Sequence, residues 1–443
     1  MITRRLLAAC LLVTAMPVAS ANELLRVYEL ALQQDMRLQA ARHARDAAIE
    51  ARPQARAALL PQINASYGYE DSSETGTEGF AGQPEARVDR DSTARALTVR
   101  LDQTLFDWAA FKRYDQAGDE AALAQADFRR AEQDLVLRIT QAYFGALSAA
   151  DNLRFSQSEK AAVERQLEQA QRRFDVGLSA ITDVQEAQAR FDLTVAQEIT
   201  AEQQLAAARE ALREITGAGP NREVPLQEEI PLRLPEPADS ERWLDTARDH
   251  NLDLVIANLQ AEIARTGIDI ARAGHLPRVG ALAQYQDLQT DGGRFTGESE
   301  IETVGVEVSL PIFAGLATRS RVSQARSTHE QFESLFQLTR RGVERSTRDA
   351  YLAVNAGAAR VRALRQAVLS STTALEASET GLEVGTRTAV DVLNAQRDLY
   401  SAQRDYARAR YDYLLSILLL KAAAGTLDVT DLEQIDALLV VGG

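Results

Sequence analysis

The sequence predicts a mixed α/β membrane protein that is mostly α-helical and is built from two structural repeats. The first observation is an internal repetition, in which residues 173–185 (RFDVGLSAITDVQ) recur as residues 381–393 (GLEVGTRTAVDVL). Gly177 pairs with Gly385 at an offset of 208 residues. A repeat this long doubles a whole supersecondary unit rather than a short module. The other two observations are paired alternating segments and a long heptad pattern, each present in both halves.

Residues 1–21 are predicted to form a secretory signal peptide, with a basic start, an apolar stretch at 6–13 and a small-residue cleavage site at 19–21. The single cysteine, Cys10, lies inside it, so a cleaved chain would carry no disulfide. Residues 7–10 weakly resemble a lipoprotein cleavage box, but too few apolar residues precede Cys10 to favour lipidation.

The formal net charge is −15, which argues against nucleic acid as a partner because phosphate binding needs basic patches. The charge fits either simple solubility or a water-filled duct that favours cations. After the signal, no apolar run reaches about 18 residues. The chain is therefore expected to be soluble in the periplasm or to cross a membrane as a barrel of alternating strands.

Each half is expected to begin with a helix, over residues 22–58 and again over residues 239–273. Both helices end just before a proline, Pro61 or Pro277, whose missing N–H and fixed φ stop a helix. Beyond each proline the apolar pattern changes from helical to alternating.

Two β-hairpins are predicted next. Apolar and polar residues alternate over four segments: 63–69, 97–105, 279–285 and 304–310. The glycine-rich polar stretches between them, residues 71–90 and 288–297, are expected to be exposed loops. Each strand would cross a bilayer once with roughly 9–11 residues. Aromatic residues near the strand ends fit either a membrane-interface girdle or ordinary strand propensity.

A very long helix is predicted after each hairpin. Apolar and small residues recur in a 4-3 alternation over residues 135–174, and the same pattern is found over residues 343–382. Sustained heptads predict supercoiled neighbouring helices. A helix over residues 108–177 would have about 70 residues and a length on the order of 100 Å, which no globular domain needs.

The long helices are expected to turn at Gly177 and Gly385, because glycine tolerates the left-handed conformation at a helix end. Return helices begin near Asp183 and Asp391. Five of the eleven prolines lie between residues 217 and 237, which predicts an extended linker. The predicted organisation is a signal peptide (1–21), a first repeat (22–217), a proline-rich linker (218–238), a second repeat (239–425) and a C-terminal tail (426–443).

Four strands per chain cannot close a membrane barrel, because the smallest barrels have about eight. An open edge in lipid leaves backbone groups unpaired at several kcal/mol each, so the chain is expected to oligomerise. Two chains would supply eight strands and three would supply twelve, and the periodicity does not choose between them.

Four motifs carry a resemblance to a known family, at residues 60–62, 176–185, 310–313 and 384–393. On these motifs, and over essentially its whole mature length, the chain resembles the TolC outer-membrane efflux and secretion channels. The resemblance implies a homotrimer in the outer membrane of a Gram-negative bacterium. It also implies a twelve-stranded outer-membrane β-barrel, held in lipid and continued into the periplasm by an α-helical coiled-coil tunnel of twelve helices.

The resemblance further implies partners. Such channels are passive exit ducts of tripartite efflux or type I secretion systems. They dock onto a periplasmic adaptor (membrane fusion) protein and an inner-membrane RND or ABC transporter, and they export drugs or proteins.

The resemblance also implies a gate at the periplasmic tip. The matching gate positions are Asp183, with Thr182 beside it, and Arg387. A tyrosine takes part in the best-known members, and Leu382 occupies that position here.

The resemblance also implies that two acidic rings can lie just inside the tip, as members of this family can carry them. Asp391 matches the first ring, whereas Asn394 stands at the second, so cation attraction should be weaker there.

Each assignment has a simpler structural alternative. Asp183 could cap its helix, with Glu186 completing a capping box, and Asp391 could cap its own helix. Leu382 lies on the 4-3 pattern and could be an ordinary packing residue, and Arg387 could be a solvated loop charge.

An enzyme is disfavoured, because the four histidines show no metal-ligand spacing and no nucleophile, phosphate or dinucleotide motif occurs. We therefore expect no catalytic residue, cofactor or metal. The alternative function is a periplasmic coiled-coil adaptor or scaffold. It would explain the helical rods but not the two alternating strand pairs.

Overall fold

The computed structural model describes residues 23–79, 82, 86–218, 224–293 and 296–439, so the predicted signal peptide lies outside the described residues. The chain divides into two compact units, and each takes segments from both halves of the sequence. The strand unit comprises residues 40–130 and 252–343. The described part of the helical unit comprises residues 23–39, 131–218, 224–251 and 344–439.

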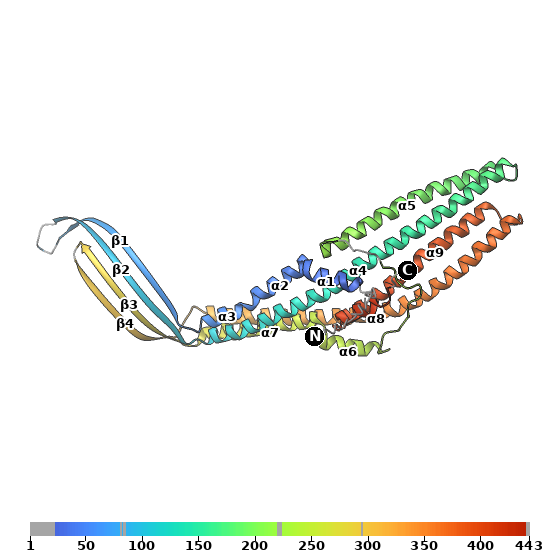
Figure 1. Cartoon of the computed structure of the whole chain (residues 1–443). Coiled ribbons are helices and arrows are strands. Elements are labelled where there is room, and N and C mark those ends of the chain that lie inside the picture. The colour runs from blue at the N-terminus through green and yellow to red at the C-terminus, as the bar shows by residue number, and fades with distance from the viewer. Residues whose placement is uncertain (1–22, 80–81, 83–85, 219–223, 294–295, 440–443) are drawn as a thin grey trace, which may run out of the picture. The chain divides into compact units, whose positions relative to one another are not determined.

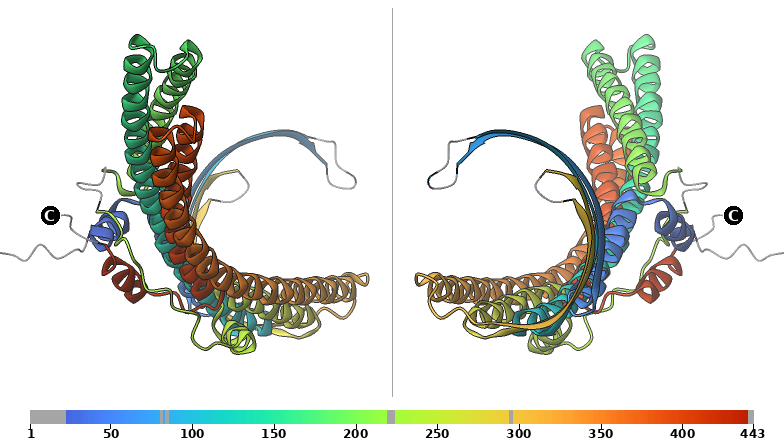
Figure 2. Two further views of the ribbon diagram at one scale, coloured as in Figure 1. Left: turned by 90° about the vertical axis from the view of Figure 1, so that its right-hand side faces the viewer. Right: turned by 90° about the vertical axis from the view of Figure 1, so that its left-hand side faces the viewer.

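The strand unit contains one antiparallel sheet of four strands in the order β1-β2-β3-β4 (Figure 1). The strands are β1 (Gln62–Glu78), β2 (Ala86–Phe106), β3 (Arg278–Gly292) and β4 (Gly297–Ser309). The two predicted hairpins lie side by side because β2 pairs with β3. The sheet is strongly curved (Figure 2). In the described chain, β1 and β4 are edges with one neighbour each.

The register gives the sheet two different faces. Ile63, Leu101, Ala283 and Val304 lie opposite one another across all four strands and form an apolar row on one face. The next row, on the other face, is polar: Asn64, Arg100, Gln284 and Thr303. The predicted alternation is therefore confirmed. Within a single chain the apolar face lies open, with Val304 86% exposed.

The strands are longer than predicted, and the prediction that residues 71–90 and 288–297 are loops is largely wrong. The strands have 17, 21, 15 and 13 residues. The ladder of β1 and β2 continues through polar sequence to the pair Glu78 and Ala86. Backbone pairing needs no apolar side chain, and cross-strand polar pairs support it. The Glu78 carboxylate accepts from Arg90 at 2.7 Å.

The two long helices are confirmed. They are α4 (Trp108–Asp175) and α8 (Ala317–Glu383), with 68 and 67 residues. Each is followed by a return helix, α5 (Ile181–Thr216) or α9 (Ala389–Ala423). We call α4–α5 the first helical hairpin and α8–α9 the second. Among the described residues, none of the helices contains a stretch long and apolar enough to cross a membrane.

The first helix of each half is interrupted, so the prediction of one continuous helix at 22–58 and at 239–273 is wrong. The elements are α1 (Glu23–Gln34), α2 (Met36–Ile49), α3 (Ala51–Ala57), α6 (Ser240–His250), α7 (Leu252–Arg272) and the short 3-10 helix η1 (Ala273–His275). Asp35 makes one break, because its carboxylate accepts from the Leu38 backbone N–H at 2.7 Å and from Arg138 at 2.8 Å. Short polar side chains that bond to the backbone compete with the helix in this way. At the break between α6 and α7, Asn251 donates its side-chain amide to the Ala423 carbonyl at 2.9 Å.

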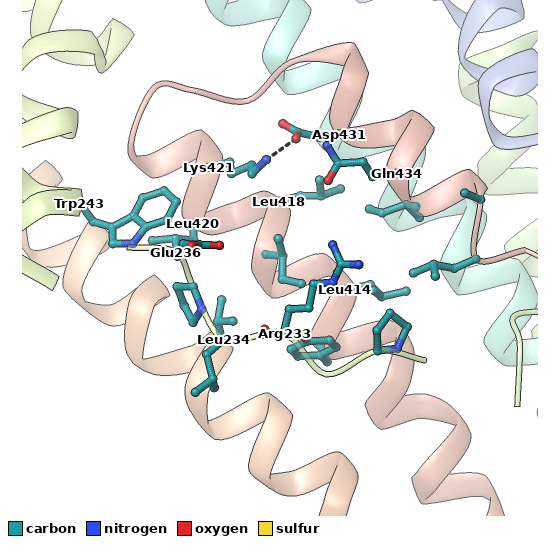
Figure 3. Close-up of a pocket in the computed structure, with 18 residues that line it drawn as sticks. Arg233, Leu234, Glu236, Trp243, Leu414, Leu418, Leu420, Lys421, Asp431 and Gln434 are labelled. Carbon is teal, nitrogen blue, oxygen red and sulfur yellow. Dashed lines mark hydrogen bonds and ion pairs between the residues drawn. The ribbon is translucent and has the colours of Figure 1, made fainter. Parts of the chain in front are cut away.

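The linker and the tail both pack on the helical unit. Arg410 and Tyr413 of α9 donate to the linker carbonyls of Gln227 and Arg233, at 2.7 and 2.6 Å. The predicted tail contains the helix α10 (Val429–Asp436). A cavity of about 550 Å³ lies between linker, α9 and α10, beside the ion pair of Lys421 with Asp431 (Figure 3).

Candidate functional site

The two helical hairpins turn with the same backbone geometry. Gly177 and Gly385 have φ angles of 76° and 80°, in the left-handed region that favours glycine. After each glycine, a backbone N–H donates to the carbonyl five residues earlier: Leu178 to Arg173 and Thr386 to Gly381, both at 2.8 Å. This pattern is a Schellman motif, which satisfies the last carbonyls of a long helix.

The second turn carries a complete cap. Thr388 is the N-cap of α9, and its hydroxyl oxygen accepts from the Asp391 N–H at 3.2 Å. The Asp391 carboxylate accepts in return from the Thr388 backbone N–H and hydroxyl, both at 2.9 Å. These bonds, led by the backbone N–H, lower the pKa of Asp391. Asp391 therefore takes part in capping its own helix, as the simpler structural alternative predicted.

The first turn carries no side-chain cap. The N-cap of α5 is Ala180, which has no side chain to donate or accept. The alternative that Asp183 caps its helix with Glu186 is wrong, because α5 begins at Ile181 and Asp183 lies inside its first turn. Over the residues that the structure describes, the Asp183 side chain has no hydrogen bond or ion pair. The exposed Thr182 lies beside it.

The other predicted site residues are close in sequence but are not joined. Arg387 is exposed on the second turn, where its guanidinium makes no hydrogen bond or ion pair with the described residues but its charge helps to lower the pKa of Asp391. Leu382 is half-buried, and Asn394 is exposed one helical turn beyond Asp391. Within one described chain, therefore, no contact connects Arg387 to Asp183.

Both turns expose apolar side chains to solvent. Val176 and Leu178 on the first turn are 69% and 71% exposed, and Val384 on the second is 69% exposed. Exposed apolar groups at the end of a structure are typical of a contact surface.

A small apolar core lies next to the turns, and both helical hairpins contribute residues to it. Its buried members are Val163 and Ala170 of α4, Ala187 of α5 and Leu393 of α9. Leu393 is the contribution of the second hairpin, so α9 packs against the α4–α5 pair in this region.

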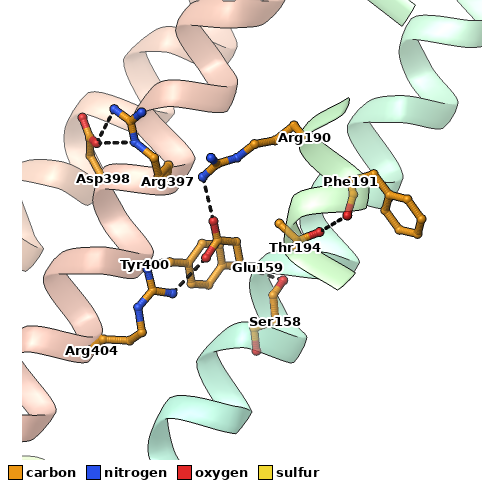
Figure 4. Close-up of polar contacts among 9 residues, drawn as sticks. All are labelled: Ser158, Glu159, Arg190, Phe191, Thr194, Arg397, Asp398, Tyr400 and Arg404. Atoms are coloured by element: carbon orange, nitrogen blue, oxygen red, sulfur yellow. Dashed lines mark hydrogen bonds and ion pairs between the residues drawn. The ribbon is translucent and has the colours of Figure 1, made fainter. Parts of the chain in front are cut away.

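Farther from the turns, a buried carboxylate connects three helices. Glu159 of α4 accepts from Arg190 of α5 at 2.9 Å and from Arg404 of α9 at 2.8 Å (Figure 4). One turn away on α9, the Tyr400 hydroxyl donates to the Ser158 carbonyl at 3.2 Å. Sequence reasoning missed this cluster, because Glu159 is one of many charges on α4 and nothing in the local pattern marks it as buried.

Among the described residues, no group of three or more His, Cys, Asp or Glu side chains is placed to hold a metal ion.

One sheet of four strands and two very long helical hairpins per chain define a channel-type outer-membrane protein. The family model "Outer membrane efflux protein" matches residues 27–218 and 243–426, and the chain belongs to this family. It is 37% identical to the outer membrane protein TolC of Vibrio cholerae, with 95% of this chain and 94% of that protein covered. It is 34% identical to the alkaline protease secretion protein AprF of Pseudomonas aeruginosa, with 96% and 89% covered.

A solved structure agrees on the fold. The crystal structure of the outer membrane protein VceC from Vibrio cholerae matches with a TM-score of 0.76 at 21% identity, covering 91% of this chain and 96% of that one. The predicted family and fold class are confirmed. The chain is an exit duct of efflux or type I secretion in the outer membrane, extending into the periplasm, and the adaptor alternative is not favoured.

Proposed function

We propose that three copies of the chain assemble into one passive channel that is gated at its helical turns. This proposal depends on the two open edges of the sheet. Strands β1 and β4, of 17 and 13 residues, each have one neighbour in the described chain. In lipid, each unpaired backbone group costs several kcal/mol, so the edges must pair with those of other copies. Three copies give twelve strands, enough for a conducting pore.

The apolar face of the sheet fits outer-membrane lipid as a partner. On β2 the apolar residues extend from Leu97 to Phe106. At about 3.3 Å per residue and a tilt of roughly 40°, this stretch matches the apolar band of about 25 Å in membrane barrels. The ladder between residues 71–78 and 86–93 is mostly polar on both faces and would extend beyond the lipid.

The proposed gate is supported by two charged side chains on the turns that make no hydrogen bond or ion pair within their own described chain. Asp183 and Arg387 make no side-chain hydrogen bond or ion pair with the described residues of their own chain, and Arg387 interacts only through its charge with Asp391, which leaves both available to a neighbouring copy. Thr182 adds a hydroxyl beside Asp183, whereas Leu382 supplies packing without a polar group. Exposed ion pairs contribute about 0.2–1 kcal/mol each, so three symmetric copies would hold the tip by only a few kcal/mol. Contacts from a partner protein could overcome that amount.

The exposed apolar residues of the turns fit a periplasmic adaptor as that partner. Val176, Leu178 and Val384 would lose their solvent exposure on docking. The adaptor would connect the duct to an inner-membrane transporter of the RND or ABC class. Relatives named for protease secretion, AprF and PrtF, are 34% and 31% identical to this chain, which makes protein cargo a candidate beside drugs.

Fractionation and conductance test the assembly. We expect the protein in the outer-membrane fraction, as a trimer whose gel migration changes on heating, and with ion conductance in planar bilayers after purification. A soluble periplasmic monomer without conductance would contradict the proposal. A stable dimer would contradict the proposed number of copies.

A further inference from the structure

Glu159 has one partner from each helical hairpin. Arg190 belongs to the same hairpin as Glu159, because α4 and α5 are joined through the turn at Gly177. Arg404 belongs to the second hairpin and reaches the other carboxylate oxygen. The Glu159 side chain is 1% exposed, whereas those of Arg190 and Arg404 are 18% and 25% exposed. A single buried charge is thus neutralised from both sides of the contact between the hairpins.

The two ion pairs respond differently if the hairpins separate. A movement of α9 away from α4 breaks the bond to Arg404 and also the bond from Tyr400 to Ser158. The same movement leaves Arg190 in place. Removing the only partner of a buried charge is strongly destabilising, because the charge is left uncompensated. Glu159 avoids that penalty because Arg190 stays bound.

We propose that Arg404 and Glu159 form a releasable latch between the two hairpins, and that Arg190 is the positioning residue that lets the latch open. The inference rests on the proposed gating function and adds a second fastening to it. Glu159 lies 18 residues before Gly177, about 27 Å along the helix at 1.5 Å per residue. The apolar core around Leu393 lies between the latch and the turn. We therefore expect release of this latch to let the two hairpins separate over a longer stretch than the turns alone.

Single-channel conductance of the purified full-length protein tests the latch. We expect Arg404→Gln to raise conductance by about twofold, because the contact between the hairpins weakens while Arg190 still compensates the buried Glu159 charge. Arg397→Gln is the matched control, because Arg397 lies on the same helix and pairs with its neighbour Asp398 at 3.0 Å. Both variants remove one positive charge and one ion pair from α9. Only Arg404→Gln removes an ion pair between the two hairpins. Equal conductance of the two variants would overturn the proposal.

Arg190→Gln gives the sharper result, because it should act in the opposite direction. With Arg190 removed, opening would leave Glu159 buried without a partner, so conductance should fall below that of the unmodified protein. A merely structural cluster would loosen in both variants and move conductance the same way. That outcome would also overturn the proposal. Adding Glu159→Gln to Arg190→Gln should remove the fall.

The tip variants Asp183→Ala and Arg387→Ser, measured in the same bilayers, separate this inference from the proposed gate. If they raise conductance and Arg404→Gln does not, the latch is wrong and the gate stands. If Arg404→Gln raises conductance and the tip variants do not, the latch is supported and the tip assignment fails. Heat-modifiable gel migration confirms that each variant assembles. Should Arg404→Gln fail to assemble, Tyr400→Phe removes the neighbouring bond and should raise conductance by a smaller factor.

Discussion

The two helical turns have the same backbone but different side-chain chemistry. Both end a long helix with a left-handed glycine and the same pair of backbone hydrogen bonds. The N-cap residue of the following helix is Ala180 in the first turn and Thr388 in the second. As a result, Asp391 is held in a capping box. Asp183, at the equivalent position of the first repeat, makes no side-chain hydrogen bond or ion pair with the residues that the structure describes.

This difference shows which constraints a duplicated unit retains. The glycine is required by its positive φ, so it stays in both halves. The N-cap hydroxyl contributes only about 1 kcal/mol, and the first turn forms without one. An aspartate freed from capping is then available for contacts outside its own helix. The two aspartates therefore have different proposed roles despite equal positions in the repeat.

The largest expected effect comes from removing the free aspartate or its proposed partner. Asp183→Ala or Arg387→Ser should raise single-channel conductance several-fold, because each removes all three symmetric links that hold the tip together. Glu186→Ala is the control, since it removes an acid from the start of the same helix. Unchanged conductance in both tip variants would remove the gate assignment and the contrast between the turns.

Much of the fold was predictable because it depends on periodic and strongly constrained residues. The heptad pattern predicted α4 and α8, and Pro61 and Pro277 predicted the change from helix to strand. The alternation gave the two faces of the sheet. The predicted strand ends were wrong because backbone pairing continues where the side chains become polar, as far as the pair of Glu78 and Ala86.

Features that depend on tertiary partners were not predictable from local pattern. The break at Asp35 depends on Arg138, about a hundred residues away. The burial of Glu159 depends on arginines of two other helices. At the turns, Ala180 and Thr388 are both visible in the sequence. Whether either residue is an N-cap depends on the first residue of its helix, because a capping box is defined by that boundary. The local sequence does not determine this boundary.

A moderate effect is expected from the aspartate of the second turn. Asp391→Asn should lower the cation preference of the channel, because it removes one of the proposed acidic rings. Asn394→Asp should raise the preference, since it adds a carboxylate one turn farther along the same helix. Reversal potentials under a salt gradient measure both. Equal reversal potentials in both variants would count against a pore-lining position for this helix face.

A smaller effect should follow from exchanging the caps. Thr388→Ala should destabilise the start of α9 by about 1 kcal/mol, and Ala180→Ser should stabilise the start of α5 by a similar amount. Hydrogen exchange of the backbone amides just after each turn measures the local stability. If the two substitutions leave exchange unchanged, the difference in capping does not determine the stability of the turns.

The smallest effect concerns pH at the second turn. The Thr388 backbone N–H and hydroxyl hold the pKa of Asp391 below its ordinary value of 3.8. Because the folded-state pKa is lowered, the carboxylate stabilises the turn above the unfolded-state pKa, and this contribution is lost as pH falls through the folded-state pKa. Cation preference due to Asp391 should therefore persist into more acidic solution than an ordinary aspartate would allow and decline as the pH falls further. Thr388→Ala removes the hydroxyl but keeps the backbone N–H, so the decline should begin at a higher pH than in the unmodified protein. Reversal potentials measured against pH, with Asp391→Asn as the baseline for the other acids, would show this shift. Coincident curves for Thr388→Ala and the unmodified protein would mean that the hydroxyl has no influence on the carboxylate.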